Sequence, residues 1–76
     1  MGNTEKVIVL LKELSGKEDI QEGDRLLDDI GLDSLGMVTL LVEIEDTFLI
    51  ELDESDMNPF DFETVESVIN MVEKYI

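Results

Sequence analysis

Three stretches of this chain repeat apolar residues every three or four positions, which is the spacing that lines one face of an α-helix. They predict helices over about 4–14, from 34 to about 49, and after residue 64. The apolar positions that define them are Val7, Leu10, Leu11 and Leu14, then Met37, Leu40, Leu41, Ile44 and Phe48, and finally Val65, Val68, Ile69, Val72 and Ile76. Strand patterns are weak and confined to residues 49–52, so the sequence predicts an all-α fold.

The ends of the predicted helices carry residues that favour helix boundaries. Asn3 or Thr4 is expected to cap the first helix, because short polar side chains accept hydrogen bonds from the free amides of a first turn. Gly16 is expected to stop that helix, since glycine adopts the left-handed backbone that ends many helices. Thr64 is expected to cap the last helix.

Two segments lie between the main helices. A short helix is predicted over Asp53–Met57, before Asn58-Pro59 ends it. Residues 15–33 lack a helical period, and a loop of this length belongs to function more often than to simple connection. Four apolar residues are expected to hold this loop against the core: Leu26, Leu27, Ile30 and Leu32.

The absence of cysteine in a chain of 76 residues limits how the fold can be stabilised. No disulfide or thiolate-bound metal can hold it together, and a chain this short buries only one modest core. We therefore expect a single domain over 1–76. It would be a small antiparallel bundle of three main helices plus one short helix, with a long loop between helices one and two.

The net charge of −15, from 20 acidic and five basic residues, restricts the partners of the chain. It repels nucleic acid and anionic membranes, and it attracts proteins with basic patches. The longest apolar run, Val7–Leu11, is far too short for a transmembrane helix or the core of a signal peptide. We expect a monomeric cytoplasmic protein that binds neither nucleic acid nor membrane.

Histidine is absent as well as cysteine, which removes the usual general base, the thiolate nucleophile and most transition-metal ligands. The acidic clusters at 28–33 and 53–56 could suggest calcium binding. Neither cluster has a glycine at the position where an EF-hand loop needs one. The sequence therefore predicts a protein without catalytic activity and without a metal site.

The segment Gly31-Leu32-Asp33-Ser34-Leu35 joins a glycine turn to the start of the second helix. Asp and Ser are common helix caps, so this pair alone could be structural. The longer stretch 26–35, which reads LLDDIGLDSL, resembles the signature of the acyl carrier protein family, in which the Ser accepts 4'-phosphopantetheine from coenzyme A. The resemblance implies that Ser34 is the attachment residue, with Asp33 and Leu35 beside it. It also implies that the protein holds acyl groups as thioesters in fatty-acid, polyketide or related specialised biosynthesis.

The same resemblance implies a set of partners. A phosphopantetheinyl transferase (holo-ACP synthase) would attach the arm, and acyl-loading, condensing or modifying enzymes with basic patches would act on the cargo. These enzymes would bind the second helix and the loop before it, where Leu35 and Val42 are expected to be exposed. The residues expected to contact them are Asp29, Val38, Val42, Glu43, Glu45 and Asp46.

Two residues depart from the pattern of many fatty-acid carriers, because Gly36 and Thr39 stand where an acid is common. These departures favour a specialised pathway over housekeeping fatty-acid synthesis. One alternative is an aminoacyl or peptidyl carrier of a nonribosomal-type pathway, although Leu32-Asp33-Ser34 favours the acyl side. A second alternative is an acidic helical interaction module without an arm, in which Ser34 is only a cap.

Overall fold

The computed structural model describes residues 2–58 and 61–76 and is helical. Its elements in chain order are α1 (Asn3–Ser15), α2 (Ser34–Phe48), the short 3-10 helix η1 (Glu54–Asp56) and α3 (Val65–Glu73). The prediction of an all-α bundle with three main helices, one short helix and a long loop after the first is confirmed. The sequence also predicted that Asn58-Pro59 ends the short helix, and Pro59 lies outside the described residues.

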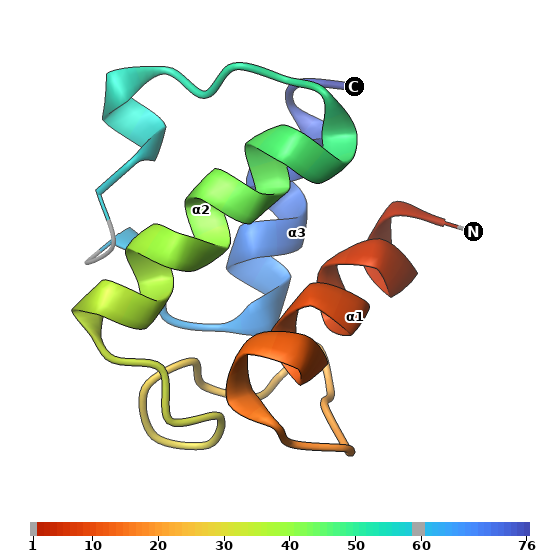
Figure 1. The fold of residues 1–76 in the computed structure, drawn as a ribbon, viewed down its shortest axis with the longest axis vertical. Coiled ribbons are helices and arrows are strands. Elements are labelled where there is room, and N and C mark those ends of the chain that lie inside the picture. The colour runs from red at the N-terminus through yellow and green to blue at the C-terminus, as the bar shows by residue number, and fades with distance from the viewer. Residues whose placement is uncertain (1, 59–60) are drawn as a thin grey trace.

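The helices pack into a body of 27 × 27 × 18 Å. In Figure 1, α1 runs from upper right to lower left, whereas α2 and α3 both run upward, so that α1 is antiparallel to the other two. The loop 16–33 closes the lower end of the molecule and leads into the start of α2. No helix among the described residues is long and apolar enough to cross a membrane.

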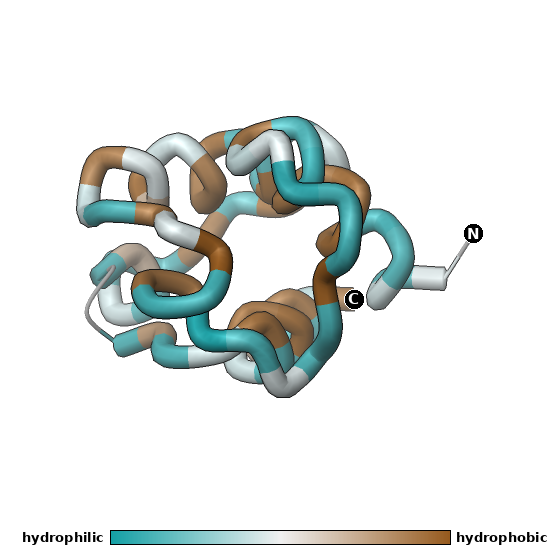
Figure 2. Tube along the Cα trace, turned by 90° about the horizontal axis from the view of Figure 1, so that it is seen from below, coloured by the Kyte–Doolittle hydropathy of each residue, from teal (hydrophilic) through white to brown (hydrophobic). Residues whose placement is uncertain are grey.

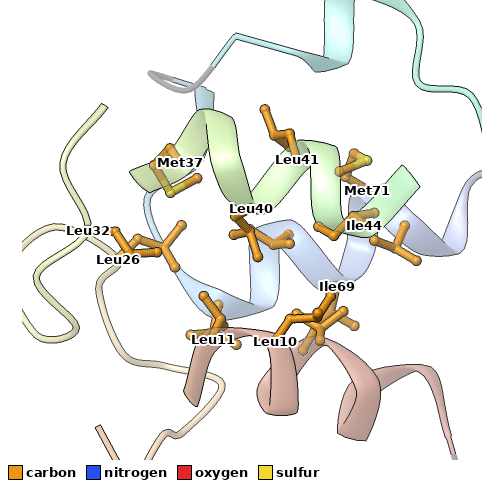
Figure 3. Close-up of a cluster of buried hydrophobic side chains, with 14 of the residues drawn as sticks. Leu10, Leu11, Leu26, Leu32, Met37, Leu40, Leu41, Ile44, Ile69 and Met71 are labelled. Atoms are coloured by element: carbon orange, nitrogen blue, oxygen red, sulfur yellow. The ribbon is translucent and has the colours of Figure 1, made fainter. Parts of the chain in front are cut away.

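The core lies where the apolar faces of the three helices meet, and the stripe predicted for α2 faces it. Leu40 and Ile44 are fully buried, and Phe48 is half-buried at the end of the helix. Figure 3 shows Leu40 between α2 and the other two helices, with Leu26 and Leu32 reaching the same cluster from the loop. The hydropathy colouring of Figure 2 alternates along the chain, as expected of helices with one apolar face.

Two apolar residues that were predicted to be buried are exposed. Leu27 is 67% exposed, because its neighbour Leu26 is hydrogen-bonded on both sides, donating to Glu63 O and accepting from Leu32 N–H, and occupies the core position. Ile76 is 57% exposed, since α3 ends at Glu73 and the residues after it no longer continue the helical face. The predictions for both side chains were wrong.

The helix ends follow the capping predictions in two of three cases. Gly16 ends α1 with a φ of 73°, and Thr64 caps α3 through a reciprocal pair of hydrogen bonds with Ser67. The residue before α1, however, is Gly2, and Asn3 and Thr4 both lie inside the helix. The prediction of a side-chain cap there was wrong, because the chain enters α1 one residue earlier than the pattern indicated.

A hydrogen-bonded group at the carboxyl end of the chain holds η1 against the end of α3. The Tyr75 hydroxyl donates to Asp56 Oδ2 and accepts from the Asp53 N–H at 3.0 Å, and Lys74 Nζ donates to Asp56 Oδ1 at 3.0 Å. The hydrogen bond from Tyr75, followed by the one from Lys74, lowers the pKa of Asp56. The Asp56 carboxylate is therefore protonated less readily in the folded protein than in the unfolded chain.

Asp56→Asn is expected to lower the Tm at neutral pH and to have progressively less effect under acidic conditions. In the native protein the Asp56 carboxylate stabilises the fold at pH values above 3.8, which is its ordinary pKa. This stabilisation is lost as the pH falls through the lowered pKa of the folded state. Thermal unfolding of both proteins from pH 7 to about pH 2 measures the difference. A difference in Tm that stays constant over this range would contradict the assignment.

Candidate functional site

The start of α2 is fixed by Asp33. Its Oδ1 accepts the Gly36 N–H at 2.8 Å, and its carbonyl oxygen accepts the Met37 N–H at 2.9 Å. Gly31, with a φ of 85°, turns the chain before this cap. Since Asp33 is the cap, Ser34 is the first residue of the helix and projects from its opening turn.

Ser34 is exposed, and its hydroxyl makes no hydrogen bond within residues 2–58 and 61–76. The amides of the first turn of a helix carry a partial positive charge, which favours a nearby anion. A phosphodiester on this oxygen would lie at the helix end that stabilises it. The position therefore fits a covalently attached phosphate group, and the exposed hydroxyl is free to accept one.

A pocket of about 530 Å³ opens beside Ser34. Most of its lining surface is apolar and comes from Leu26, Leu27, Leu32, Met37 and Phe62, while the charged residues Arg25, Asp28, Asp33 and Glu63 also line it. Figure 3 shows three of these side chains, those of Leu26, Leu32 and Met37, gathered near the start of α2. A flexible group attached to Ser34 would thus have an apolar surface within reach.

Gly36, one of the two departures from the family pattern, has a structural explanation. A Cβ atom at this position would lie 3.1 Å from Leu32 Cδ2 and 3.3 Å from Asp33 Oδ1. Both contacts are tighter than usual, so a larger residue would press on the capping carboxylate and on a buried leucine. Glycine lets the cap and the loop pack closely at the site. The other departure, Thr39, donates its hydroxyl to the carbonyl of Leu35 at 3.1 Å.

Four of the six residues predicted to contact partners are exposed on α2, and the other two are acids that accept backbone hydrogen bonds. Val38 and Val42 are 43% and 46% exposed on α2, and Glu43 and Asp46 are exposed near them. Leu35, next to Ser34, is 74% exposed, as expected.

The other two acids predicted to contact partners already bind the backbone. Asp29 Oδ2 accepts the Arg25 N–H at 2.8 Å, and Glu45 Oε2 accepts the Leu52 N–H at 3.0 Å from its half-buried position. Asp29 therefore stabilises the turn of the long loop. Glu45 fixes the chain after α2.

Sequence reasoning did not assign Phe62 or Arg25 to the site. Phe62 is separated from Ser34 by 28 positions and reaches the pocket because Leu26 N–H donates to Glu63 O, which joins the two segments. The aromatic character of residues 58–62 was the available signal, but nothing in the local pattern places that segment beside α2. Arg25 gave no signal beyond being the last basic residue before a long acidic stretch.

The fold and site together define a class of protein. A helical bundle that presents an exposed serine at a helix start, beside a mainly apolar pocket and with no hydrogen bond from its hydroxyl to the described residues, has the features of a protein that carries a group on that oxygen. The described residues also contain no group of three acids arranged to bind a metal ion.

The Phosphopantetheine attachment site family matches residues 5–72. The chain belongs to this family of phosphopantetheine-binding carrier proteins, whose members are not enzymes and whose prosthetic group is 4'-phosphopantetheine. The alternative of an interaction module without an arm does not agree with this membership.

Individual relatives agree with the family. The acyl carrier protein of Thermotoga maritima is 32% identical, over 91% of this chain and 85% of its own. The D-alanyl carrier protein of Streptococcus pyogenes is 39% identical, over 92% of this chain and 91% of its own. A solved structure from Mycobacterium tuberculosis, provisionally assigned as an acyl carrier protein, superposes with a TM-score of 0.85 at 27% identity, covering 96% and 97% of the two chains.

Proposed function

We propose that Ser34 is the attachment residue for 4'-phosphopantetheine and that the protein holds acyl groups as thioesters for enzymes of fatty-acid, polyketide or related specialised biosynthesis. The observation that supports this most directly is the exposed hydroxyl of Ser34 at the start of α2, which makes no hydrogen bond to the residues that the structure describes and lies beside a mainly apolar pocket. When bound, the prosthetic group supplies the thiol that this cysteine-free chain lacks.

Each residue around Ser34 has a distinct task in this proposal. The Asp33 carboxylate holds the first turn of α2 in place and thereby fixes the position of the Ser34 backbone at the helix start. The free amides at the helix start stabilise the negative charge of the phosphodiester. Leu35 offers an exposed apolar contact immediately beside the attachment point. Leu26, Met37 and the other apolar lining residues shield part of an apolar cargo from water.

The partners would recognise α2 by charge and by apolar contact. Glu43 and Asp46 would attract lysine and arginine patches over distances of about a Debye length, and Val38 and Val42 would supply the contact on docking. Such partners are a phosphopantetheinyl transferase and the enzymes that load, condense or modify the acyl group. We further propose that the protein acts as a monomer in the cytoplasm.

An aminoacyl cargo is the second candidate, and the Streptococcus pyogenes relatives favour it, because they are D-alanyl carrier proteins at 39% identity. A D-alanyl thioester is small and carries an ammonium group at neutral pH. An aliphatic acyl chain would bury surface against the apolar part of the pocket lining, whereas Asp28, Asp33 and Glu63 in the same lining would attract the ammonium group. The apolar surface, which makes up most of the lining, supports the first candidate, and the three acids support the second.

The cargo can be identified on the protein purified from its native cells. Neutral hydroxylamine cleaves thioesters and releases the acyl group as a hydroxamate, which mass spectrometry identifies. We expect an aliphatic or oxidised aliphatic hydroxamate from the native protein and none from a Ser34→Ala variant expressed in the same cells. Recovery of alanine hydroxamate would instead support the second candidate. Equal release from the variant would contradict attachment at Ser34.

A further inference from the structure

Leu49 ends α2 in a conformation that leucine rarely adopts. Its φ and ψ are 56° and 47°, and among the described residues it is the one non-glycine with a positive φ. Its N–H donates to Glu45 O, so it completes the last turn as a left-handed cap. At the end of α1 the same task falls to Gly16, which has no Cβ to strain. A leucine at this position therefore destabilises the end of α2 relative to a glycine.

The side chain of Leu49 also contributes nothing to the core. It is 90% exposed, although Phe48 and Ile50 on either side both pack partly against the buried cluster. A single exposed apolar residue is ordinary on a protein surface. An exposed apolar residue in a strained backbone conformation is unusual, because neither burial nor backbone preference explains a leucine there.

Leu49 adds an exposed apolar side chain at the end of α2 that lies farther from Ser34. Leu35, Val38 and Val42 are exposed along the helix itself, and Leu49 follows Val42 by seven residues as the C-cap. The helix has 15 residues, so Leu49 lies about 22 Å from Ser34 at 1.5 Å per residue. Figure 1 shows the two ends of α2 on opposite sides of the molecule. A protein interface that covers about 800 Å² of each partner is wide enough to contact both ends.

The surroundings of Leu49 determine the chemistry of a matching partner. Asp46 and Glu51 are exposed on either side of it along the chain. From Leu26 to Glu73 the sequence contains 14 acidic residues and no lysine or arginine. A surface that accepts Leu49 must therefore combine an apolar pocket with a basic rim.

We infer that Leu49 anchors the phosphopantetheinyl transferase, inserting into an apolar pocket bordered by lysine or arginine while Ser34 lies at the transferase active site. This inference rests on the proposed function, because it requires an enzyme that docks along α2 to reach Ser34. The left-handed backbone directs the Leu49 side chain away from the fold. Leu49 thus destabilises the end of α2 but gives the transferase a fixed apolar contact far from Ser34.

Leu49→Asn separates this role from a structural one, because asparagine tolerates the left-handed conformation and removes the apolar contact. We expect the Tm to rise by about 3–6 °C. In initial-rate assays with coenzyme A and a holo-ACP synthase, we expect the KM for the unmodified protein to rise about tenfold with kcat nearly unchanged. Leu49→Gly should behave in the same way, whereas Leu49→Met should keep the native KM.

The matched control is Val9→Asn, which removes an apolar side chain that is 39% exposed on α1, and which should leave the KM unchanged. A KM for Leu49→Asn within twofold of native, or a fall in its Tm, would overturn the inference. Failure of the native protein to accept phosphopantetheine at all would instead contradict the proposed function. The two failures are therefore distinguishable in one set of assays.

Discussion

Leu40→Ala is expected to lower the free energy of unfolding by about 3 kcal/mol, the cost of removing a fully buried leucine whose space the surroundings cannot refill. Leu40 lies between α2 and the other two helices, so the cavity would open where all three faces meet. A chain of 76 residues without disulfides has a total stability of about 4–11 kcal/mol. The loss would lower the Tm by roughly 15 °C.

The control for this prediction is Leu35→Ala, which makes the same chemical change on the same helix at a position that is 74% exposed. It should change the free energy of unfolding by about 0.5 kcal/mol or less. Urea unfolding followed by far-UV circular dichroism compares the two variants with the native protein. Equal destabilisation by both would mean that the assignment of the core and exposed faces of α2 is wrong.

The helix faces could be predicted because their signal is local. The stripe that includes Leu40 and Ile44 is defined by spacing alone, and one α-helix has one geometry for that spacing. The caps Thr64 and Gly16 are equally local, since they act on residues within one turn. The family signature at 26–35 was visible for the same reason, as a short contiguous stretch.

The rest depends on contacts between distant residues, which periodicity does not contain. The Leu26 N–H donates to the carbonyl oxygen of Glu63, and this hydrogen bond determines which of Leu26 and Leu27 faces the core. The neighbouring Arg25 pairs with Thr64 through the backbone in an isolated β-bridge. The local pattern could therefore show that Leu26 and Leu27 are apolar but not which leucine is buried. Phe62 reaches the pocket through the same pairing of segments.

The acids on the proposed docking face illustrate a second limit. Glu43 and Glu45 look equivalent in the sequence, yet Glu45 accepts the N–H of Leu52 and Glu43 stays exposed. Leu49 is the converse case, because its sequence context gave no reason to expect a left-handed backbone. Local rules that a chain violates without structural benefit are typical of functional positions, which is why we assign a role to this residue.

Ser34→Ala is expected to abolish loading with phosphopantetheine while leaving the fold nearly unchanged. The hydroxyl of Ser34 makes no hydrogen bond within the described residues, and Asp33 rather than Ser34 caps α2. The change in the free energy of unfolding should therefore be about 0.5 kcal/mol or less. A complete loss of one chemical modification without a loss of stability would identify the attachment oxygen.

Intact mass spectrometry after incubation with coenzyme A and a broad-specificity phosphopantetheinyl transferase tests this directly. The native protein should gain one phosphopantetheine, and so should Ser55→Ala, which removes another exposed serine. Ser34→Ala should gain none. Modification of Ser34→Ala to the native extent would contradict the account. So would an unmodified native protein that is folded, in a reaction where the transferase modifies a known carrier.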